Sequence, residues 1–448
     1  MIQEICVAQA ATVVCGKSSL DWDSFYCGFV LAIILGEEGL QGRPEQLLRG
    51  SLIMMNSIRS SLATDCDEPE PEVRRNTFLE LLWLARPLYA TKEVDKVYSL
   101  LGLIAPGEAK RLRLWPNYNI TPVQCYTETA LSILQDSQNL DLLMTERMID
   151  PAQAFVLPSW VPNWSYVATP TPTEAWRDDK SHGGHRPASP SQTKSTARPF
   201  CASGSCATYH VALANPSTIV LSGYVFDRIL ITEKTLTVPP ADQEMIQNST
   251  TSLSAVGSLL LSLFSGLGDY FETLVLWEKL ALDDKYTPYP NGQDPTWVYA
   301  TTLCWDEAPN GPTALIGDYQ KWRTMIRGPK QLSLLKKLGM HRLDRIWKVS
   351  MGLAGTFTGF KNVDDRRFAT ATERTLCRRL ARLGKGYLGV VPAESQPGDA
   401  VALFRGAEMP LVIRARGSGW ELIGPAYIHG IMYGEGWDES RSGEMHIS

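Results

Sequence analysis

Three side chains near the C-terminal end of this chain have the types needed for acid–base chemistry. His429 and Glu435 could act as a general acid and base if a turn brings the imidazole and the carboxylate together. Asp399 is a further carboxylate in the same part of the chain. A structural role competes with this chemistry, because Asp399 begins an expected strand after the Pro397-Gly398 turn and His429 can satisfy its hydrogen bonds locally. We favour the structural role and keep all three as candidate catalytic residues.

The sequence lacks the common signatures of enzyme active sites. It contains no Gly-x-Ser-x-Gly elbow, no P-loop and no His-Glu-x-x-His pair. Gly417-Ser418-Gly419 lacks the third glycine of a dinucleotide-binding loop and is expected to be a hairpin turn. The nine cysteines are scattered and odd in number, which favours free thiols in a reducing compartment, and no second pair completes a zinc site with Cys201 and Cys206. We expect no metal and no cofactor, and whether the chain is an enzyme stays open.

Aromatic side chains supply the candidate ligand-binding residues. Residues 157–165 read Leu-Pro-Ser-Trp-Val-Pro-Asn-Trp-Ser, and the two prolines make this Trp–Pro segment a stiff connector that is neither helix nor central strand. Trp160 and Trp164 are expected to pack against a core, with the lining of a ligand site as the alternative. Trp420 and Tyr427 are further candidates, since an aromatic-lined sheet in the second half could hold a small apolar ligand.

Length and composition indicate a soluble protein of two or three domains. The chain has 448 residues, of which 44% are hydrophobic and 20% charged. Its net charge of -5 argues against a nucleic-acid-binding protein. The first residues lack the basic region of a secretory signal, and the apolar runs at 27–35 and 255–267 are too short or too interrupted to span a bilayer. We therefore expect a cytoplasmic protein without a membrane partner.

The first half of the chain is expected to be helical. Apolar residues recur at helical spacing in 44–58, 78–85 and 94–101. Thr121 is the clearest helix start, because Pro122 follows it and Gln124 completes a capping box. Residues 167–199 are rich in Thr, Pro, Ser, Gly and His and poor in apolar side chains, which is typical of a flexible linker. The sequence thus predicts a helical region over 1–166 followed by a linker.

The second half, residues 200–448, is expected to be a mixed α/β region. A strand is predicted over 219–231, and helices are predicted over 252–282, 329–338 and 364–383, the last with a solvated face of arginines. Short apolar runs separated by Gly-rich and Pro-rich turns then predict strands over 387–391, 400–404, 411–415, 420–423 and 427–432. These strands predict a small antiparallel sheet or barrel over about 384–436. The fold class is therefore α+β.

Blocks of residues along most of the chain resemble the fungal heterokaryon-incompatibility (HET) domain proteins. The N-terminal blocks are Ile2-Gln3-Glu4-Ile5 with Ala8, Cys15-Gly16 with Trp22, Ala90-Thr91, Asp95 to Leu103, Pro116-Asn117-Tyr118 and Leu157 to Ser165. The C-terminal blocks are Gly386-Tyr387-Leu388-Gly389, Pro397-Gly398-Asp399 and Tyr427 to Met432 with Gly434-Glu435. The resemblance implies that the chain begins inside the last helix of the HET domain, whose larger part would lie upstream of Met1.

The resemblance implies a role related to fungal self/non-self recognition. Because the expected effector domain is nearly all missing, our first hypothesis is an interaction or regulatory protein that binds a protein partner. The second is a repurposed, cofactor-free cyclase or isomerase of fungal specialised metabolism, similar to a pericyclase, which would bind a small apolar ligand. The third is a fragment of a full-length HET cell-death effector.

Overall fold

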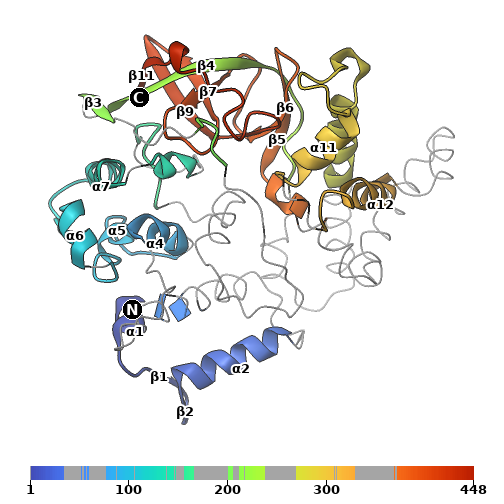
Figure 1. The fold of residues 1–448 in the computed structure, drawn as a ribbon. Coiled ribbons are helices and arrows are strands. Elements are labelled where there is room, and N and C mark those ends of the chain that lie inside the picture. Colours follow the sequence, from blue (N-terminus) through green and yellow to red (C-terminus); the bar gives the residue numbers. More distant parts are fainter. Residues whose placement is uncertain are drawn as a thin grey trace, which may run out of the picture. The chain divides into compact units, whose positions relative to one another are not determined.

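The structure is a computed structural model that divides into two compact units. It describes residues 2–34, 52, 55–56, 58–59, 77–86, 88–104, 106–137, 139–145, 147, 156–165, 200–204, 211–215, 217–237, 269–306, 308, 310–327, 368 and 371–448. The first unit consists of Met1–Ser137, Arg147–Pro170 and Arg177–Pro187, and the second consists of Gln138–Glu146, Thr171–Trp176 and Ala188–Ser448. Both units contain helices and strands, and the class is α+β, as predicted (Figure 1).

The first unit opens with a helix, a hairpin and a second helix. These elements are α1 (Ile2–Val7), β1 (Thr12–Cys15), β2 (Ser18–Asp21) and α2 (Trp22–Ile34), and β1 pairs with β2 in antiparallel register. The hairpin was not predicted. Arg59 closes the end of α1, since its guanidinium donates to the carbonyl oxygens of Ile5 at 2.7 Å and Ala8 at 2.5 Å. The Trp22 indole N–H donates to Asn56 at 3.1 Å.

Four further helices form the body of the first unit. They are α4 (Phe78–Ala85), α5 (Asp95–Tyr98), α6 (Pro106–Leu112) and α7 (Pro122–Asp136). The predicted helix over 78–85 is confirmed, while the helix predicted over 94–101 is a single short turn, α5. The capping box at the start of α7 is also confirmed, because Thr121 Oγ1 accepts the Gln124 N–H and Gln124 Oε1 accepts the Thr121 N–H.

The Trp–Pro segment belongs to the first unit. Residues 156–165 form turns and extended backbone without helix or strand, as the prolines predicted. Trp160 and Trp164 are each only 1% exposed, so the prediction that they pack into a core is confirmed. The Ser165 hydroxyl lies 2.5 Å from the Tyr126 hydroxyl, which ties the segment to α7.

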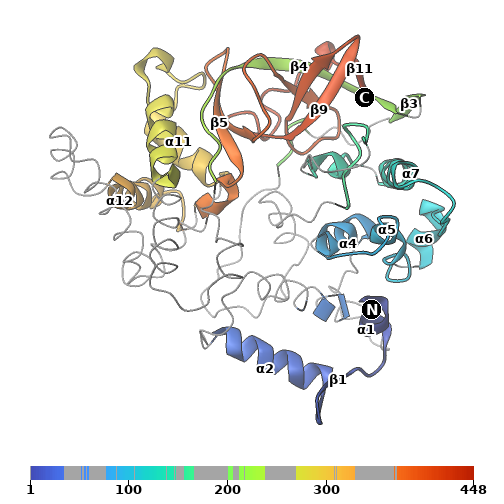
Figure 2. The same ribbon diagram turned by 180° about the vertical axis from the view of Figure 1, so that it is seen from behind.

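The second unit contains a closed five-stranded β-barrel. Its strands are β4 (Thr218–Thr232), β7 (Ala400–Phe404), β8 (Leu411–Arg416), β9 (Gly419–Pro425) and β11 (Gly443–Ile447). The pairings run β4–β7–β8–β9–β11 and return to β4, which closes the ring (Figure 1). The predicted C-terminal sheet is confirmed, but the ring takes β4 and β11 from outside the predicted segment 384–436, and β11 pairs with β9 in parallel. Figure 2 shows β4, β9 and β11 together from behind.

Strand β4 is long enough to join the barrel to a second set of strands. Its first part holds β3 (Ala212–Asn215) and β11, its middle holds β7, and its end pairs with β5 (Arg378–Leu383). Beyond β5 follow β6 (Leu388–Pro392) and β10 (Tyr427–Ile428). At Gly223 a Cβ atom would lie 2.4 Å from the Leu403 carbonyl oxygen, so β4 and β7 approach closely only because this position is a glycine.

The remaining elements of the second unit are helical. They are η2 (Asp141–Met144), a helix over 269–281, η3 (Asp284–Tyr286), α11 (Pro295–Leu303), α12 (Leu315–Arg327), η5 (Glu373–Thr375) and η6 (Glu439–Arg441). The helix predicted over 329–338 and the linker over 167–199 lie outside the described residues, as does most of the helix predicted over 44–58. None of the described helices is both long and apolar enough to cross a bilayer.

The prediction of a solvated arginine helix over 364–383 is wrong for its second half. That half contains η5 and β5, and Arg378 and Arg382 on β5 are 0% and 1% exposed. Arg378 donates to the Pro425 carbonyl oxygen at 2.8 Å. Arg382 donates to the carbonyl oxygens of Leu280 and Ala281 at the end of helix 269–281, which is a common way to satisfy the last carbonyls of a helix. These buried carbonyl acceptors, which the local pattern does not show, hold the arginines inside.

Candidate functional site

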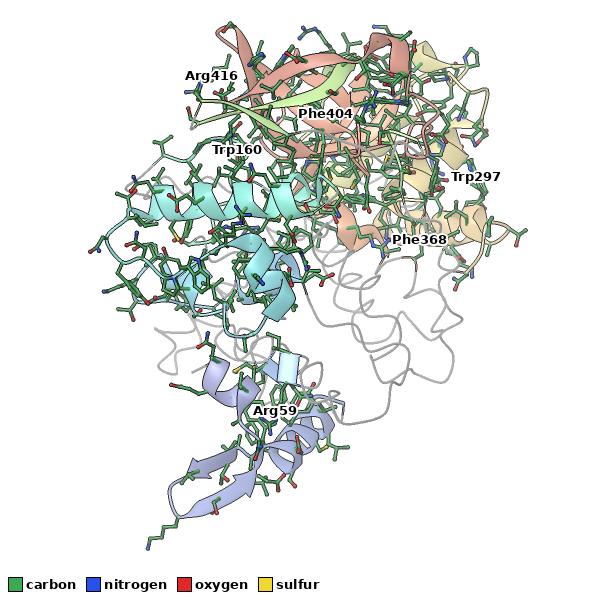
Figure 3. All side chains as sticks on the ribbon, turned by 60° about the vertical axis from the view of Figure 1, so that its left-hand side comes forward. Arg59, Trp160, Trp297, Phe368, Phe404 and Arg416 are labelled. Carbon is green, nitrogen blue, oxygen red and sulfur yellow. The ribbon has the colours of Figure 1, made fainter. Side chains whose placement is uncertain are left out.

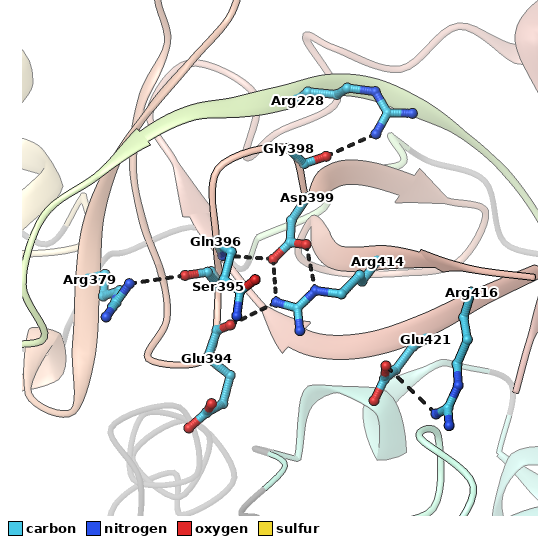
Figure 4. A network of polar contacts seen from close by, with 10 residues as sticks. All are labelled: Arg228, Arg379, Glu394, Ser395, Gln396, Gly398, Asp399, Arg414, Arg416 and Glu421. Carbon is cyan, nitrogen blue, oxygen red and sulfur yellow. Dashed lines mark hydrogen bonds and ion pairs between the residues drawn. The ribbon is translucent and has the colours of Figure 1, made fainter.

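Asp399 forms the centre of a structural hydrogen-bond network at the start of β7. Its carboxylate receives Nε and Nη2 of Arg414 at 2.8 and 2.9 Å and the Gln396 N–H at 2.7 Å (Figure 4). Arg414 also donates to the Glu394 carbonyl oxygen, so one guanidinium fixes the 394–399 turn against β8. Asp399 is 4% exposed, and its two oxygens are occupied by these donors. A carboxylate that is buried and bound by three donors is well suited to orient a turn.

His429 belongs to a series of hydrogen-bonded neutral polar groups that runs from the surface into the core. Its Nε2 lies 2.6 Å from Gln293 Oε1, and its Nδ1 lies 3.3 Å from the Tyr427 hydroxyl. The Gln293 oxygen only accepts hydrogen bonds, so Nε2 carries the proton and Nδ1 accepts the Tyr427 O–H. The Asn291 amide donates to the same Gln293 oxygen at 2.7 Å. Gln293 is the exposed end of this hydrogen-bond series, and Tyr427 is its buried end.

Burial keeps His429 and Tyr427, the two ionisable residues of this hydrogen-bond series, uncharged. It lowers the pKa of His429 to about 4 and raises the pKa of the Tyr427 hydroxyl well above its usual value. The basic Nδ1 of His429 faces the Tyr427 hydroxyl, which is itself 1% exposed. Tyr289 fixes the backbone beside it, since its hydroxyl donates to the His429 carbonyl oxygen at 2.8 Å and accepts the Leu388 N–H at 3.1 Å. The arrangement suits orientation of Gln293 better than proton transfer.

Glu435 is engaged elsewhere and does not pair with His429. Its Oε2 accepts the Tyr433 N–H at 2.8 Å, while the Tyr433 hydroxyl donates to Asp306 at 2.5 Å. Within the part of the chain that the structure describes, no hydrogen bond or ion pair joins Glu435 to His429. The three catalytic candidates therefore lie in three separate networks.

A stack of large side chains lies behind Tyr427. The Trp305 ring is nearly parallel to the Tyr427 ring at 5.9 Å between centroids, and the Arg378 guanidinium lies 4.9 Å from the Trp305 centroid. Phe200 packs against Tyr427 with the two rings tilted by 56° and 5.8 Å between ring centroids. Tyr427 is thus a core residue enclosed by aromatic and cationic neighbours. The sequence did not connect Trp305 with Tyr427 or Gln293 with His429, because neither pair lies in a motif and only the fold brings them together.

A shallow open groove lies beside the exposed end of the hydrogen-bond series. Six residues from the start of α11, the segment before it and α12 line the groove: Gln293, Asp294, Thr296, Trp297, Ile316 and Gln320. Trp297 is partly exposed on α11, and Figure 3 labels it. Asp294 is not free to bind a cation, because its carboxylate caps α11 by accepting the N–H groups of Thr296 and Trp297.

The ligand-binding candidates of the sequence do not meet at this groove. Trp160 and Trp164 are core residues of the first unit, and Trp420 is a half-buried residue of β9 in the barrel. The seven cysteines that the structure describes are free thiols. Among the described residues, no three His, Cys, Asp or Glu side chains converge as a metal site would require.

The fold and the candidate site define an α+β protein with a closed β-barrel, in which Asp399, His429 and Glu435 each form hydrogen bonds within the protein. Residues 344–447 match the family model of the Het-6 beta-barrel domain. The chain is also 25% identical over 430 residues to heterokaryon incompatibility protein 6, OR allele, of Neurospora crassa, covering 85% of this chain and 54% of that protein. No solved structure matches.

The C-terminal segment of this chain is therefore similar to a Het-6 β-barrel domain, and most of the chain is similar to a fungal heterokaryon incompatibility protein. The chain spans about half the length of the curated relative it matches. The family resemblance read from the sequence is confirmed.

Proposed function

We propose that this chain serves fungal self/non-self recognition as an interaction protein and not as an enzyme. Its similarity to a protein named for heterokaryon incompatibility supports the recognition role. The observation that carries the non-enzymatic part is the internal pairing of each acid–base candidate. Asp399 binds Arg414, Glu435 accepts a backbone N–H, and His429 lies between Gln293 and Tyr427. Groups held in this way stabilise a surface and leave recognition to its exposed side chains.

Strain pairing tests the proposal directly. Fungal strains that carry the wild-type gene, a deletion or a Glu435→Gln allele would be confronted and scored for heterokaryon formation. We expect deletion to change compatibility and Glu435→Gln to behave as wild type, because an exposed carboxylate without a chemical task is dispensable. Unchanged compatibility after deletion, together with no partner captured by cross-linking, would refute the recognition role. Loss of function in Glu435→Gln at normal protein abundance would argue for chemistry instead.

A cofactor-free cyclase or isomerase is the second candidate, and the groove beside Gln293 favours it. The groove places a partly exposed indole, Trp297, next to an amide that is oriented by His429. Shape and oriented hydrogen bonds can suffice for reactions of apolar substrates. Thermal-shift screening with apolar polycyclic compounds tests this candidate. A shift that Trp297→Ala removes and Trp420→Ala retains would support it, and silence across the panel would exclude it.

A further inference from the structure

Two loops of the first unit expose aromatic side chains to solvent. Tyr89 is 80% exposed, Trp115 is 74% exposed and Tyr118 is 57% exposed. Several large hydrophobic side chains are highly exposed among the described residues, and these three are the aromatic ones. All three lie in the loops 88–95 and 113–118. Exposed apolar residues scattered singly need no explanation, but aromatic residues gathered on neighbouring loops mark an interaction surface.

Helix α5 holds the two loops together. The Tyr118 hydroxyl donates to Asp95 at 2.8 Å, and the Tyr98 hydroxyl donates to the Asn117 carbonyl oxygen at 3.1 Å. From the same short helix, the buried Lys96 ammonium donates to the carbonyl oxygens of Arg86, at 2.9 Å, and Leu88. Both loops, 88–95 and 113–118, are therefore anchored by side chains of α5.

The anchoring holds the Tyr118 ring in place before any partner arrives. Tyr98 packs edge-on against Tyr118 with 5.5 Å between ring centroids, so the base of the Tyr118 ring is supported. Arg113, two residues before Trp115, has a φ of 52°, a strained value that the surrounding structure must maintain. A rigid aromatic surface loses little entropy on binding, which is the property of binding hot spots rich in Trp and Tyr.

Three exposed basic side chains belong to this part of the first unit. The Lys92 ammonium lies 5.1 Å from the Tyr118 ring centre, and Lys110 and Arg113 are exposed beside Trp115 in the sequence. None of these three cations has an ion pair with the described acidic residues. Of the acidic groups nearby, Asp95 accepts the Tyr118 hydroxyl, while Glu93 and Glu128 are exposed.

We propose that the loops 88–95 and 113–118 form a docking surface for an acidic, extended segment of a partner protein that carries aromatic or proline residues. The rings of Trp115, Tyr118 and Tyr89 would stack on the partner's apolar side chains, and Lys92 and Arg113 would bind its carboxylates. This inference rests on the proposed function, since it names the surface through which an interaction protein would act.

The same features fit a nucleic acid less well. Single-stranded nucleic acid needs a continuous positive track beside its stacking platform. Here the exposed Glu93 directly follows Lys92, so the basic side chains do not form a continuous track, and the whole chain has a net charge of -5. An acidic peptide needs only local complementarity, which Lys92 and Arg113 provide.

Peptide selection with the full-length chain tests the docking surface. A phage-displayed library of random 12-residue peptides would be selected on the wild-type protein, and the enriched peptides would be synthesised for affinity measurement. We expect enrichment of Asp and Glu together with Pro or aromatic residues, and affinity that falls with rising salt. Trp115→Ala should weaken binding by about tenfold or more, as truncation of a hot-spot residue does. Leu31→Ala, which removes an exposed apolar side chain elsewhere in the same unit, should leave affinity unchanged.

Further variants separate charge from ring contact. The double variant Lys92→Glu and Arg113→Glu should reverse the selection toward basic peptides. Selection without an acidic bias, or affinity unaffected by Trp115→Ala, would overturn the proposal. Trp115-dependent binding of poly(U) RNA in place of peptides, or a dimer that Trp115→Ala disperses, would also overturn it in favour of that other occupant.

The strain-pairing experiment keeps this inference distinct from the proposed function. If Trp115→Ala abolishes peptide binding but leaves compatibility unchanged, the docking surface stands and its use in recognition fails. If deletion changes compatibility while Trp115→Ala binds peptides normally, recognition stands and this surface is not its site.

Discussion

The two units of this chain use aromatic side chains in opposite ways. In the barrel unit Trp305 and Tyr427 are buried, at 0% and 1% exposure, Trp297 and Trp420 are half-buried, and no described aromatic side chain is among the highly exposed large hydrophobic residues. In the helical unit two tryptophans of the Trp–Pro segment are equally buried, yet Trp115 and two tyrosines lie in solvent on anchored loops. The same residue type therefore stabilises one region and is available for binding in the other. Exposure, and not residue type, separates the two roles.

The largest expected effect distinguishes tryptophans within one unit. Trp160→Ala should lower the free energy of unfolding by about 3–5 kcal/mol, because a buried ring leaves a cavity. Trp115→Ala is the matched control and should change stability by less than about 0.5 kcal/mol, since its ring is exposed. Urea denaturation of both variants measures the difference. Equal losses would show that Trp115 is a packing residue, which would remove the contrast on which the docking surface depends.

The closure of the barrel gives the next effect. Gly223→Ala would place a methyl group 2.4 Å from the Leu403 carbonyl oxygen and should cost about 3 kcal/mol through displacement of β4 from β7. Gly28→Ala in α2 is the control, because its added methyl group meets no atom within 4 Å and should stabilise the helix by roughly 0.5–1 kcal/mol. Soluble yield and thermal unfolding report both changes. A neutral Gly223→Ala would mean that the two strands are not tightly apposed.

Acidic pH should destabilise the barrel unit through His429. The folded pKa of about 4 lies below the ordinary value near 6.5, so the unfolded chain binds the proton more readily between these values. Stability should therefore be complete above about pH 6.5 and fall by roughly 3 kcal/mol as pH drops to 4 and below. His429→Gln should flatten this part of the stability profile relative to wild type. An unchanged profile in the variant would show that His429 is accessible to solvent.

Alkaline pH should act on the helical unit through Lys96, with a smaller effect. Burial, with the Arg86 charge beside it, lowers the pKa of Lys96 to about 8 from an ordinary value near 10.5. The unfolded chain then binds more protons between pH 8 and 10.5, so this group makes stability rise with pH in that interval. Lys96→Met should remove the rise, as measured by urea denaturation at pH 7.5, 9 and 10. A rise that persists in the variant would assign it to another group.

The parts of the fold that sequence reasoning predicted correctly are those with local causes. Turn residues such as Pro397-Gly398 separate the strands of the barrel, and β7 has the predicted bounds. The capping box at Thr121 depends only on neighbours in the sequence. The burial of Trp160 follows from the size of its side chain and the stiff backbone around it.

The parts that failed depend on distant partners. Strand β5 reads as a helix because Arg378 and Arg382 look solvated until the carbonyl oxygens of Pro425, Leu280 and Ala281 are near. The pairing of His429 with Gln293 joins positions 136 apart in the sequence, and the pattern around neither residue indicates it. Sequence reasoning named Asp399 without its partner, Arg414, for the same reason.

Strand β4 has a consequence for exchanging parts of this protein with its relatives. The Het-6 barrel match covers residues 344–447, yet the strand that closes the ring is Thr218–Thr232, which lies outside that segment. A chimera that receives only residues 344–447 from a relative would pair a foreign β7 and β11 with the native β4. The side chains across these two strand pairings would then be mismatched. The residues that must be exchanged together therefore form two separate segments. An allele swap that preserves the strand pairings of the barrel must carry residues 218–232 along with the C-terminal segment.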